Sequence, residues 1–234
     1  MIMNIWSYLL LSFLFLCHCD GESSSFDFYL FAQEWPPSLC ETNREHKFRE
    51  PSDWSSNPRW TIHGLWPSKN YSDGPEYCND SYPFSLAPLK DLMSQIQYDW
   101  PNMFADTNES SLWDHEWTKH GTCAMSSDSL HNEHDYFATA LSIYQTLNLY
   151  KALDNSGIIP SKTDSYEVDK VLKALTAAYG VEPNIACEHS ESIGQYLSEI
   201  HVCLDKTFRR IDCGSFVYSY SVCQSKESVK YLTF

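Results

Sequence analysis

The sequence predicts one α+β domain, with a mostly antiparallel central sheet flanked by helices and held by disulfides. Three observations favour this fold class. The 234 residues are enough for one domain, or for one domain behind a leader. Short aromatic and apolar runs alternate with segments of helical spacing, and nine cysteines are distributed along the chain. No internal repeat, low-complexity tract or interdomain linker divides the sequence.

The strands are predicted from short apolar runs between polar or proline-containing segments. The aromatic run 26–33 predicts a central strand, and residues 60–65 predict a second strand that ends before Pro67. Later strands are expected over residues 185–187, 195–204 and 216–223.

Helices are predicted where apolar residues recur every three or four positions. This spacing is found over residues 86–98, 135–153 and 166–179, and Gly180 is expected to end the last helix. Residues 36–59, with four prolines, and residues 68–84 are predicted to be long loops.

The first nineteen residues contain no charged side chain and include a short apolar core at residues 8–16. This pattern predicts a signal peptide over residues 1–19 and a mature domain over residues 20–234. The alternative is an uncleaved anchor, but the apolar run is shorter than the ~20 residues that span a bilayer. We therefore expect no membrane insertion and a secreted protein, with a lysosomal or vacuolar location as the alternative. Glycosylation sequons at Asn70, Asn79 and Asn108 agree with this route.

The formal net charge is −15, and none of it comes from the first nineteen residues. Proteins that bind nucleic acids tightly through phosphate contacts are usually basic. The charge therefore argues against a stable RNA-binding protein and against a DNA-binding protein. It is compatible with an enzyme that has a local cationic site and releases its product quickly.

Two segments, 60–67 and 115–123, carry the residues with evident chemistry. If the second segment is helical, the ~100° advance per residue gathers its polar groups within half of the helix circumference. A cleft could then receive the side chains of His63, His115, Glu116, Lys119 and His120. Two imidazoles can divide acid and base work because their usual pKa is ~6.5, and a lysine can stabilise a phosphate in its transition state. The set indicates cleavage of RNA without a metal.

A zinc protease is the alternative that the His-Glu pair at 115–116 raises. That motif needs a second histidine four residues after the first, and Lys119 occupies this position. We therefore expect neither a metal nor another cofactor. The structural alternative is a set of histidines with no catalytic role.

The two segments resemble the active-site segments of the ribonuclease T2 family (the Rh/T2/S acid ribonucleases). The matching residues are Ile-His-Gly-Leu-Trp-Pro at 62–67 and His-Glu-Trp-Thr-Lys-His-Gly-Thr-Cys at 115–123, and the resemblance covers nearly all of the predicted mature domain. Residues 78–84 are most similar to the animal branch, in which secreted helminth egg ribonucleases are one group.

The resemblance implies a role for each catalytic position. His120 would be the general base, His63 the general acid, and His115 a phosphate ligand, while Glu116 and Lys119 would stabilise the transition state. The substrate would be single-stranded RNA, cleaved through a 2′,3′-cyclic phosphate, and DNA would not be cut.

Base contacts are implied less directly. Trp66 is expected to stack on a base, with core packing as its alternative role. Gln33 and Trp113 are candidates for a second base site. Relatives often carry an acidic residue where this chain has Ser68, so no base preference is inferred.

The resemblance also implies the disulfides Cys78–Cys123, Cys187–Cys223 and Cys203–Cys213. Residues 41–59 hold no cysteine that could pair with Cys40. Cys40 is therefore expected to be a buried or capped free thiol, with a disulfide dimer or an adventitious partner as alternatives. We expect a monomer.

A second function class stays open. The chain could act as a secreted signalling or recognition glycoprotein, an immunomodulator or cytotoxin, that enters cells through a glycan-binding uptake receptor. The filled catalytic positions favour the enzyme.

Overall fold

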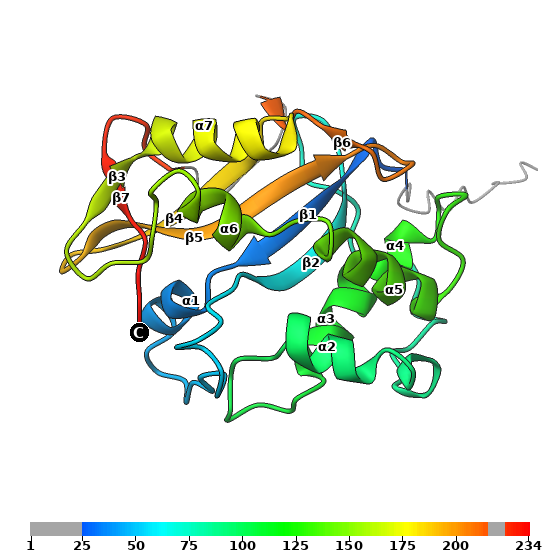
Figure 1. Ribbon diagram of the computed structural model, residues 1–234. Helices are drawn as coiled ribbons and strands as arrows, with labels where there is room; N and C mark the ends of the chain where they lie inside the picture. The colour runs from blue at the N-terminus through cyan, green and yellow to red at the C-terminus, as the bar shows by residue number, and fades with distance from the viewer. Residues whose placement is uncertain (1–24, 215–222) are drawn as a thin grey trace, which may run out of the picture.

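The computed structural model describes residues 25–214 and 223–234, and in this part of the chain seven strands form one sheet (Figure 1). The strand order is β2-β1-β5-β7-β3, and β4 and β6 also pair with β5. The strand pairings in these residues are antiparallel except for β5 with β7, which is parallel. The strands are β1 (Phe28–Glu34), β2 (Thr61–Ser68), β3 (Ser165–Glu167), β4 (Asn184–Ser190), β5 (Gly194–Leu204), β6 (Arg210–Ile211) and β7 (Ser228–Lys230).

Most helices lie on one face of the sheet or beyond its β2 edge (Figure 1). They are α1 (Pro36–Thr42), η1 (Ala87–Leu89), α2 (Met93–Asp99), α3 (Ser111–Glu116), η2 (Trp117–Gly121), α4 (Thr122–Ala124), α5 (Glu133–Tyr144), α6 (Leu149–Asp154) and α7 (Val168–Tyr179). The α+β fold with a mostly antiparallel sheet, predicted from the sequence, is confirmed.

The two faces of the sheet are covered differently. Side chains alternate between the faces of a strand, so Tyr29 and Phe31 of β1 pack against helix α5 in the main core. Leu30 and Ala32 point to the other face, where a small cluster includes Cys203 and Cys213. This second face is covered less completely, and its polar residues are available for a site.

Several predicted elements need correction. Residues 36–42 form α1 inside a segment predicted as a loop, and Pro36 and Pro37 are buried at its start. Proline is tolerated in the first turn of a helix, because the N–H groups there have no intrahelical partner.

The segment 135–153 contains two helices, α5 and α6, because Asn148 caps a new helix by accepting a hydrogen bond from the Lys151 amide. Gly180 ends α7 in the left-handed conformation, with φ of 75°, as predicted. The strand predicted at 216–223 and the leader at 1–19 lie outside the described residues, apart from Cys223.

The three disulfides form as the resemblance implied. Cys78 pairs with Cys123, Cys187 with Cys223 and Cys203 with Cys213. Cys40 on α1 is a free, partly exposed thiol.

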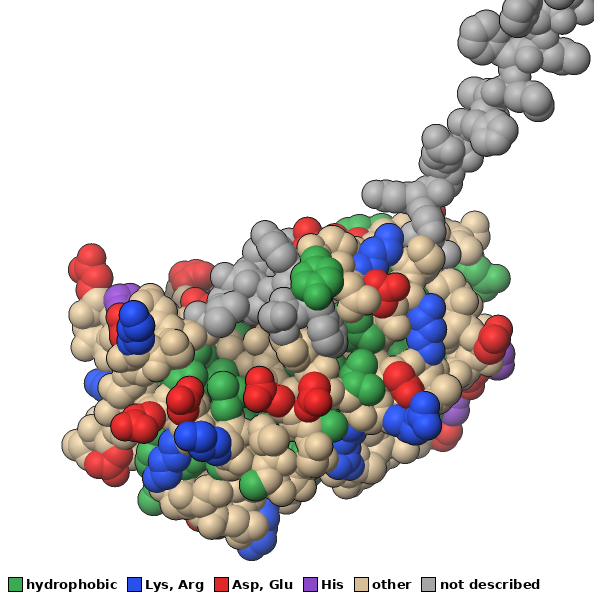
Figure 2. All heavy atoms as spheres, turned by 90° about the horizontal axis from the view of Figure 1, so that it is seen from above, with side chains coloured by type: hydrophobic (Ala, Val, Ile, Leu, Met, Phe, Trp, Pro, Cys, Tyr) green, Lys and Arg blue, Asp and Glu red, His purple; other side chains and the backbone are tan. Residues whose placement is uncertain are grey.

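No helix in the described ranges is long and apolar enough to cross a membrane. Figure 2 shows the face over α7, where acidic and basic side chains lie next to one another. The described residues of this face therefore form no extended basic patch of the kind that binds nucleic acids tightly.

Candidate active site

The pleat of the sheet brings polar residues from three strands to the less covered face. Glu34 of β1 lies opposite Glu199 of β5, and Ala32 lies opposite His201. Asn184 of β4 is the partner of His201 on the other side. Because directly paired residues share a face of the sheet, Glu34, Glu199, His201 and Asn184 point to the same side.

His63 joins this face through a β-bulge in β2. Ala32 pairs with Gly64 and Gln33 pairs with Ile62, so His63 is the extra residue between them. A bulge re-aims a side chain that regular alternation would turn to the other face. The indole of Trp100 donates a hydrogen bond of 2.8 Å to the His63 carbonyl and holds the bulge from the core side.

The other two histidines come from one helical segment that changes its winding. Helix α3 ends at Glu116 and continues as the π-helical turn η2 before α4 begins. In a π-helix residues five apart are bonded along the axis, whereas a regular α-helix would separate them by ~140° around it. The rings of His115 and His120, five residues apart, have centroids 6.4 Å from each other.

Glu116 is buried at the centre of the site, with only 1% of its surface exposed. Its Oε2 accepts a hydrogen bond of 2.8 Å from the Trp66 indole. Its Oε1 has no hydrogen-bond partner among the described residues and lies 3.8 Å from His63 Nε2. A Cβ on Gly64 would lie 2.1 Å from Glu116 Oε2, so a glycine is needed for this approach.

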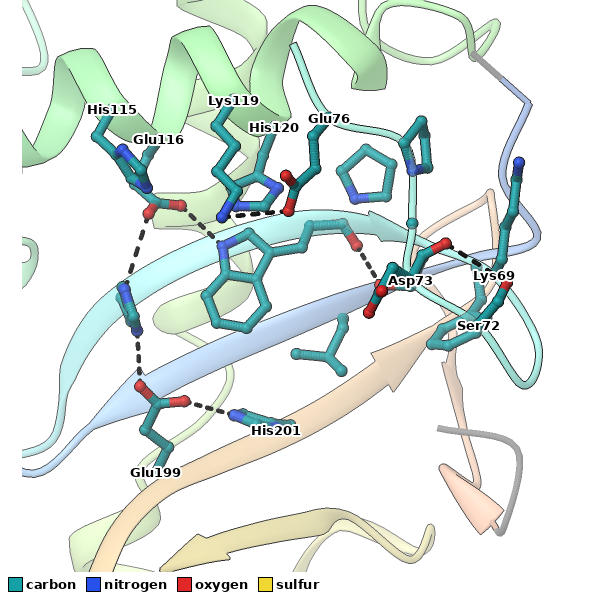
Figure 3. A pocket seen from close by; sticks show the side chains of 18 of the residues that line it. Lys69, Ser72, Asp73, Glu76, His115, Glu116, Lys119, His120, Glu199 and His201 are labelled. Carbon is teal, nitrogen blue, oxygen red and sulfur yellow. Dashed lines mark hydrogen bonds and ion pairs between the residues drawn. The ribbon is translucent and has the colours of Figure 1, made fainter. Parts of the chain in front are cut away.

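A cavity of about 340 Å³ opens over these groups (Figure 3). One wall is the helical segment α3–η2, which bears Lys119, and Leu30 and Ala186 also line the cavity. The opposite wall is the loop 68–76, whose Glu76 forms an ion pair of 3.1 Å with Lys119. The Tyr77 amide donates to the Lys119 carbonyl, which attaches this loop to the helix.

The two histidines that face the cavity have opposite electrostatic environments. Burial lowers the pKa of His63, but the charge and hydrogen bond of Glu199, with Glu34 nearby, outweigh burial and raise it well above the usual value. Burial, with the positive charge of Lys119, holds the pKa of His120 far below the usual value. Environments that separate the pKa values of two groups in this way are typical of an acid and base pair.

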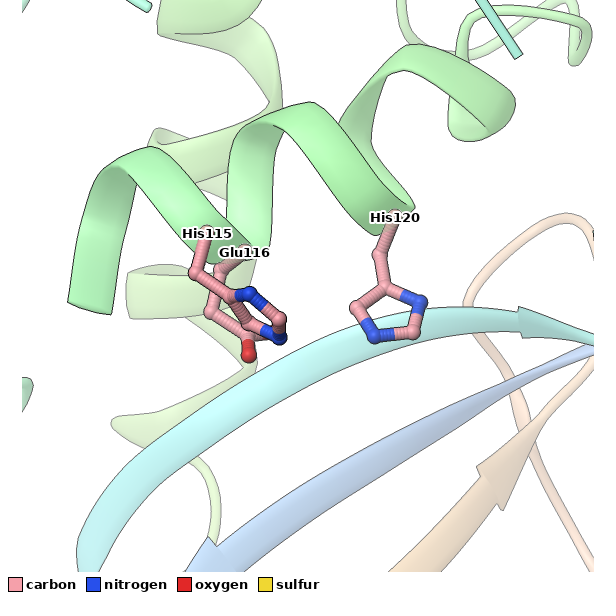
Figure 4. Close-up of side chains that lie close together, drawn as sticks. All are labelled: His115, Glu116 and His120. Carbon is pink, nitrogen blue, oxygen red and sulfur yellow. The ribbon is translucent and has the colours of Figure 1, made fainter. Parts of the chain in front are cut away.

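Two groups of residues could also hold a metal ion by distance alone. His115, Glu116 and His120 offer ligand atoms within 4.8 Å of one another (Figure 4), as do Glu34, His63 and Glu199. Burial and the positive charge of Lys119 lower the pKa of both His115 and His120, and the same charge disfavours a cation at the first group. At the second group, Glu199 already bonds two histidines.

The structure gathers the five catalytic candidates and Trp66 around this cavity. Gln33 and Trp113, predicted for a second base site, lie elsewhere. Gln33 pairs with Ile62 and Ile200 on the core face of the sheet. Trp113 is buried and donates to the Trp100 carbonyl. Neither lines the cavity.

Sequence reasoning missed the acidic residues around His63 and the histidine behind them. Glu199, His201 and Glu76 line the cavity, and Glu34 is 5% exposed beside it. The polar-apolar-polar order of Glu199, Ile200 and His201 is a local signal for two side chains on one face of a strand.

Comparison with known proteins agrees with this geometry. The family model described as "Ribonuclease T2 family" matches residues 26–213. The chain is 39% identical over 208 residues to Ribonuclease Oy from Magallana gigas, which covers 88% of this chain and 95% of that protein. It is 34% identical over 212 residues to Ribonuclease T2 from Danio rerio, with 88% and 81% covered.

Solved structures give the same result. RNase NT in complex with 5′-AMP superposes with a TM-score of 0.77 and 29% identity, covering 90% of this chain and 100% of that chain. Human RNase T2 gives a TM-score of 0.70 with 34% identity, covering 88% and 98%. The chain belongs to the ribonuclease T2 family.

Proposed function

We propose that this RNase T2-type endoribonuclease cleaves single-stranded RNA without a metal ion, with His120 as general base and His63 as general acid. His120 removes the proton of the ribose 2′-OH, and the 2′-oxygen attacks the phosphorus. His63 gives its proton to the leaving 5′-oxygen as the P–O5′ bond breaks. The products are a 2′,3′-cyclic phosphate and a free 5′-OH, and water can then open the ring to a 3′-phosphate.

The observation that carries this proposal is the contrast between the two imidazoles across one cavity. The carboxylates around His63 favour its protonated form, which an acid requires. Burial and Lys119 favour the neutral form of His120, which a base requires. Each histidine is therefore in its reactive state over the same range of pH.

The remaining residues act on charge and position. Lys119 has its ammonium group at the cavity wall, where it stabilises the negative charge that develops on the phosphate. Glu116 has a buried, unpartnered oxygen for a group of the substrate, and His115 binds the phosphate.

Trp66 is proposed to stack on a base. Its ring lies 5.0 Å from the His63 ring and 5.4 Å from the His120 ring, at the cavity. Because its indole also donates to Glu116, Trp66 has a second role in holding that carboxylate. DNA has no 2′-OH and is not cleaved by this route.

The test is digestion of single-stranded RNA in EDTA at roughly pH 4.5 to 7.5, which brackets the histidine pKa. We expect cyclic phosphate ends from the wild type and a loss of at least ~100-fold in the His120→Ala variant. His134→Ala is the matched control, because His134 lies on α5 and pairs with Asp91 away from the cavity. Cleavage that survives in His120→Ala, or that requires a divalent metal, would refute the proposal.

We also propose secretion and glycosylation. The uncharged leader and the three sequons support this route, and Asn70 and Asn108 are exposed. Mass spectrometry of the secreted protein before and after glycosidase treatment tests it. The signalling alternative stays a prediction, and a biological effect that persists in His63→Phe would favour it.

A further inference from the structure

We infer that Glu199 is the positioning residue for the general acid, which holds the His63 ring in the orientation that directs Nε2 to the leaving oxygen. His201 and Asn184 hold Glu199 in turn. This inference rests on the proposed role of His63 and adds to it a residue outside the two motif segments.

The contacts form an unbroken chain behind His63 (Figure 3). The His63 Nδ1–H donates to Glu199 Oε1 over 2.7 Å. The other carboxylate oxygen, Oε2, lies 2.6 Å from His201 Nε2. The Nδ1 of His201 accepts from the Asn184 amide over 3.1 Å, which leaves the proton of a neutral His201 on Nε2, directed at Glu199. Both oxygens of Glu199 are therefore engaged.

These hydrogen bonds determine which nitrogen of His63 can act as the general acid. Because Nδ1 is occupied by Glu199, Nε2 is the nitrogen that carries the transferable proton. Nε2 faces Glu116 Oε1 at 3.8 Å, too far for a hydrogen bond but on the side of the cavity. After the proton leaves, His63 is neutral and keeps its Nδ1–H bond to Glu199, so the ring does not need to turn before it is protonated again.

Charged groups reach His63 from every element around it. Glu34 of β1, Glu199 of β5 and Glu116 of α3 favour its positive form. His115 and His120 oppose that form when they are charged. Of the three carboxylates, Glu199 alone is within hydrogen-bond distance of the imidazole in the described residues. Glu199 therefore stabilises the positive charge of His63 and also orients its ring, and β5, which bears Glu199, is a central strand of the sheet.

The pairing of β1 with β5 explains why Glu199 can do this. Glu199 lies directly opposite Glu34, beside the bulge that re-aims His63. Two facing carboxylates would repel each other. Glu34 is buried and its pKa is raised to about 7, chiefly by burial, whereas His63 and His201 overcome burial and hold the pKa of Glu199 low. Near neutral pH, Glu199 therefore carries the negative charge more fully than Glu34.

The test is the pH profile of kcat for RNA in Glu199→Gln, which keeps the size and an acceptor oxygen but removes the charge. We expect kcat to fall by about 10- to 100-fold and the alkaline limb to move down by about one pH unit or more, with a smaller change in KM. Glu199→Asp, which keeps the charge, should keep the wild-type limb. Glu188→Gln on β4 is the matched control, because Glu188 lies opposite Tyr196 and away from His63.

A second substrate separates an effect on the acid from general damage. In a nucleoside 3′-(4-nitrophenyl phosphate), the leaving group needs no proton, so His63→Ala and Glu199→Gln should come within a few-fold of the wild type. Equal losses on both substrates, or an unmoved alkaline limb, would overturn the inference. If His63→Ala cleaves RNA like the wild type, the proposed function fails instead.

NMR titration of the wild type decides the matter even if Glu199→Gln does not fold. The His63 ring should stay protonated well above the usual ~6.5, with an Nδ1–H signal of a strong hydrogen bond. A ring that titrates at or below that value would contradict the inference.

Discussion

His63 and His120 are chemically identical side chains, and their neighbours shift their pKa values in opposite directions. His63 reaches a carboxylate at 2.7 Å, while the Nδ1 of His120 is buried without a hydrogen-bond partner in the described structure. Lys119 lies one position before His120 and adds a positive charge that disfavours a second one. The two protonation states therefore follow from packing and charge.

Glu116 should show a trade-off between stability and activity. Burial raises its pKa from 4.5 to about 7, against the opposing charge of His63. A raised carboxyl pKa means that the folded state binds the proton more tightly than the unfolded state. The carboxyl group therefore costs folding free energy increasingly as pH rises from about 4.5 through about 7.

The Glu116→Gln variant should accordingly lose activity and gain stability. We expect kcat to fall by about 10²-fold or more, and the free energy of unfolding to increase by on the order of 1–3 kcal/mol above pH ~7, with no gain below pH ~4.5. Urea unfolding at several pH values measures this. A variant that is less stable than the wild type at pH ~8 would show that the carboxylate stabilises the fold.

Among the residues of the site, the sequence predicts those that lie close together along the chain. The spacing of His115, Glu116, Lys119 and His120 is visible in the sequence, because one helix presents all four. Glu199 and His201 are more than 130 positions from His63, and no local spacing links them. The pairing of β2 with β1, and of β1 with β5, brings them together.

Two irregular elements shape the site, and no pattern in the sequence predicts either of them. The bulge at His63 and the π-helical turn at 117–121 each shift a hydrogen-bond register by one residue. Both irregularities are of the kind that recurs at functional sites, and no short-range pattern in the sequence marks their positions. The regular periods predict β1 and α7 and most of β2, which continues through Pro67 to Ser68 where an end was predicted. The split of α5 from α6 depends on a single cap at Asn148.

The disulfide Cys78–Cys123 should matter more than Cys203–Cys213. The first closes a separation of 45 residues and the second closes 10. The loop-entropy relation then gives losses of about 4 and about 3 kcal/mol on removal. Cys78–Cys123 also joins the loop that bears Glu76 to the helix that bears Lys119.

Double alanine variants of each pair, compared by urea unfolding and by kcat, test this difference. Removal of Cys78–Cys123 should lower both stability and kcat, because the loop that bears Glu76 is then no longer held beside Lys119. Removal of Cys203–Cys213 should lower stability with little change in kcat. The reverse order of losses would mean that the loop does not position the helical segment that bears Lys119.

At the scale of the whole molecule, Lys119 and His63 carry positive charge into the cavity of a strongly acidic protein. The net charge is −15, and acidic and basic side chains are mixed on the face in Figure 2. Long RNA should therefore be repelled at a distance and attracted only within the cavity, where Lys119 and the protonated His63 lie. Weak binding outside the cavity lets the cleaved product leave quickly.

This arrangement predicts an unusual salt dependence. Raising the ionic strength from ~10 to ~100 mM shortens the Debye length from ~30 to ~10 Å, so the long-range repulsion is screened. The local phosphate contacts weaken at the same time. For single strands, the logarithm of the binding constant falls with the logarithm of the salt concentration, with a slope of about −0.7 per neutralised phosphate. For long RNA the two effects oppose each other, whereas a dinucleoside phosphate is too small to experience much of the repulsion. We therefore expect kcat/KM for long RNA to stay level or rise over this range, while kcat/KM for a dinucleoside phosphate falls. A steep fall for long RNA would show that basic contacts outside the cavity dominate its binding.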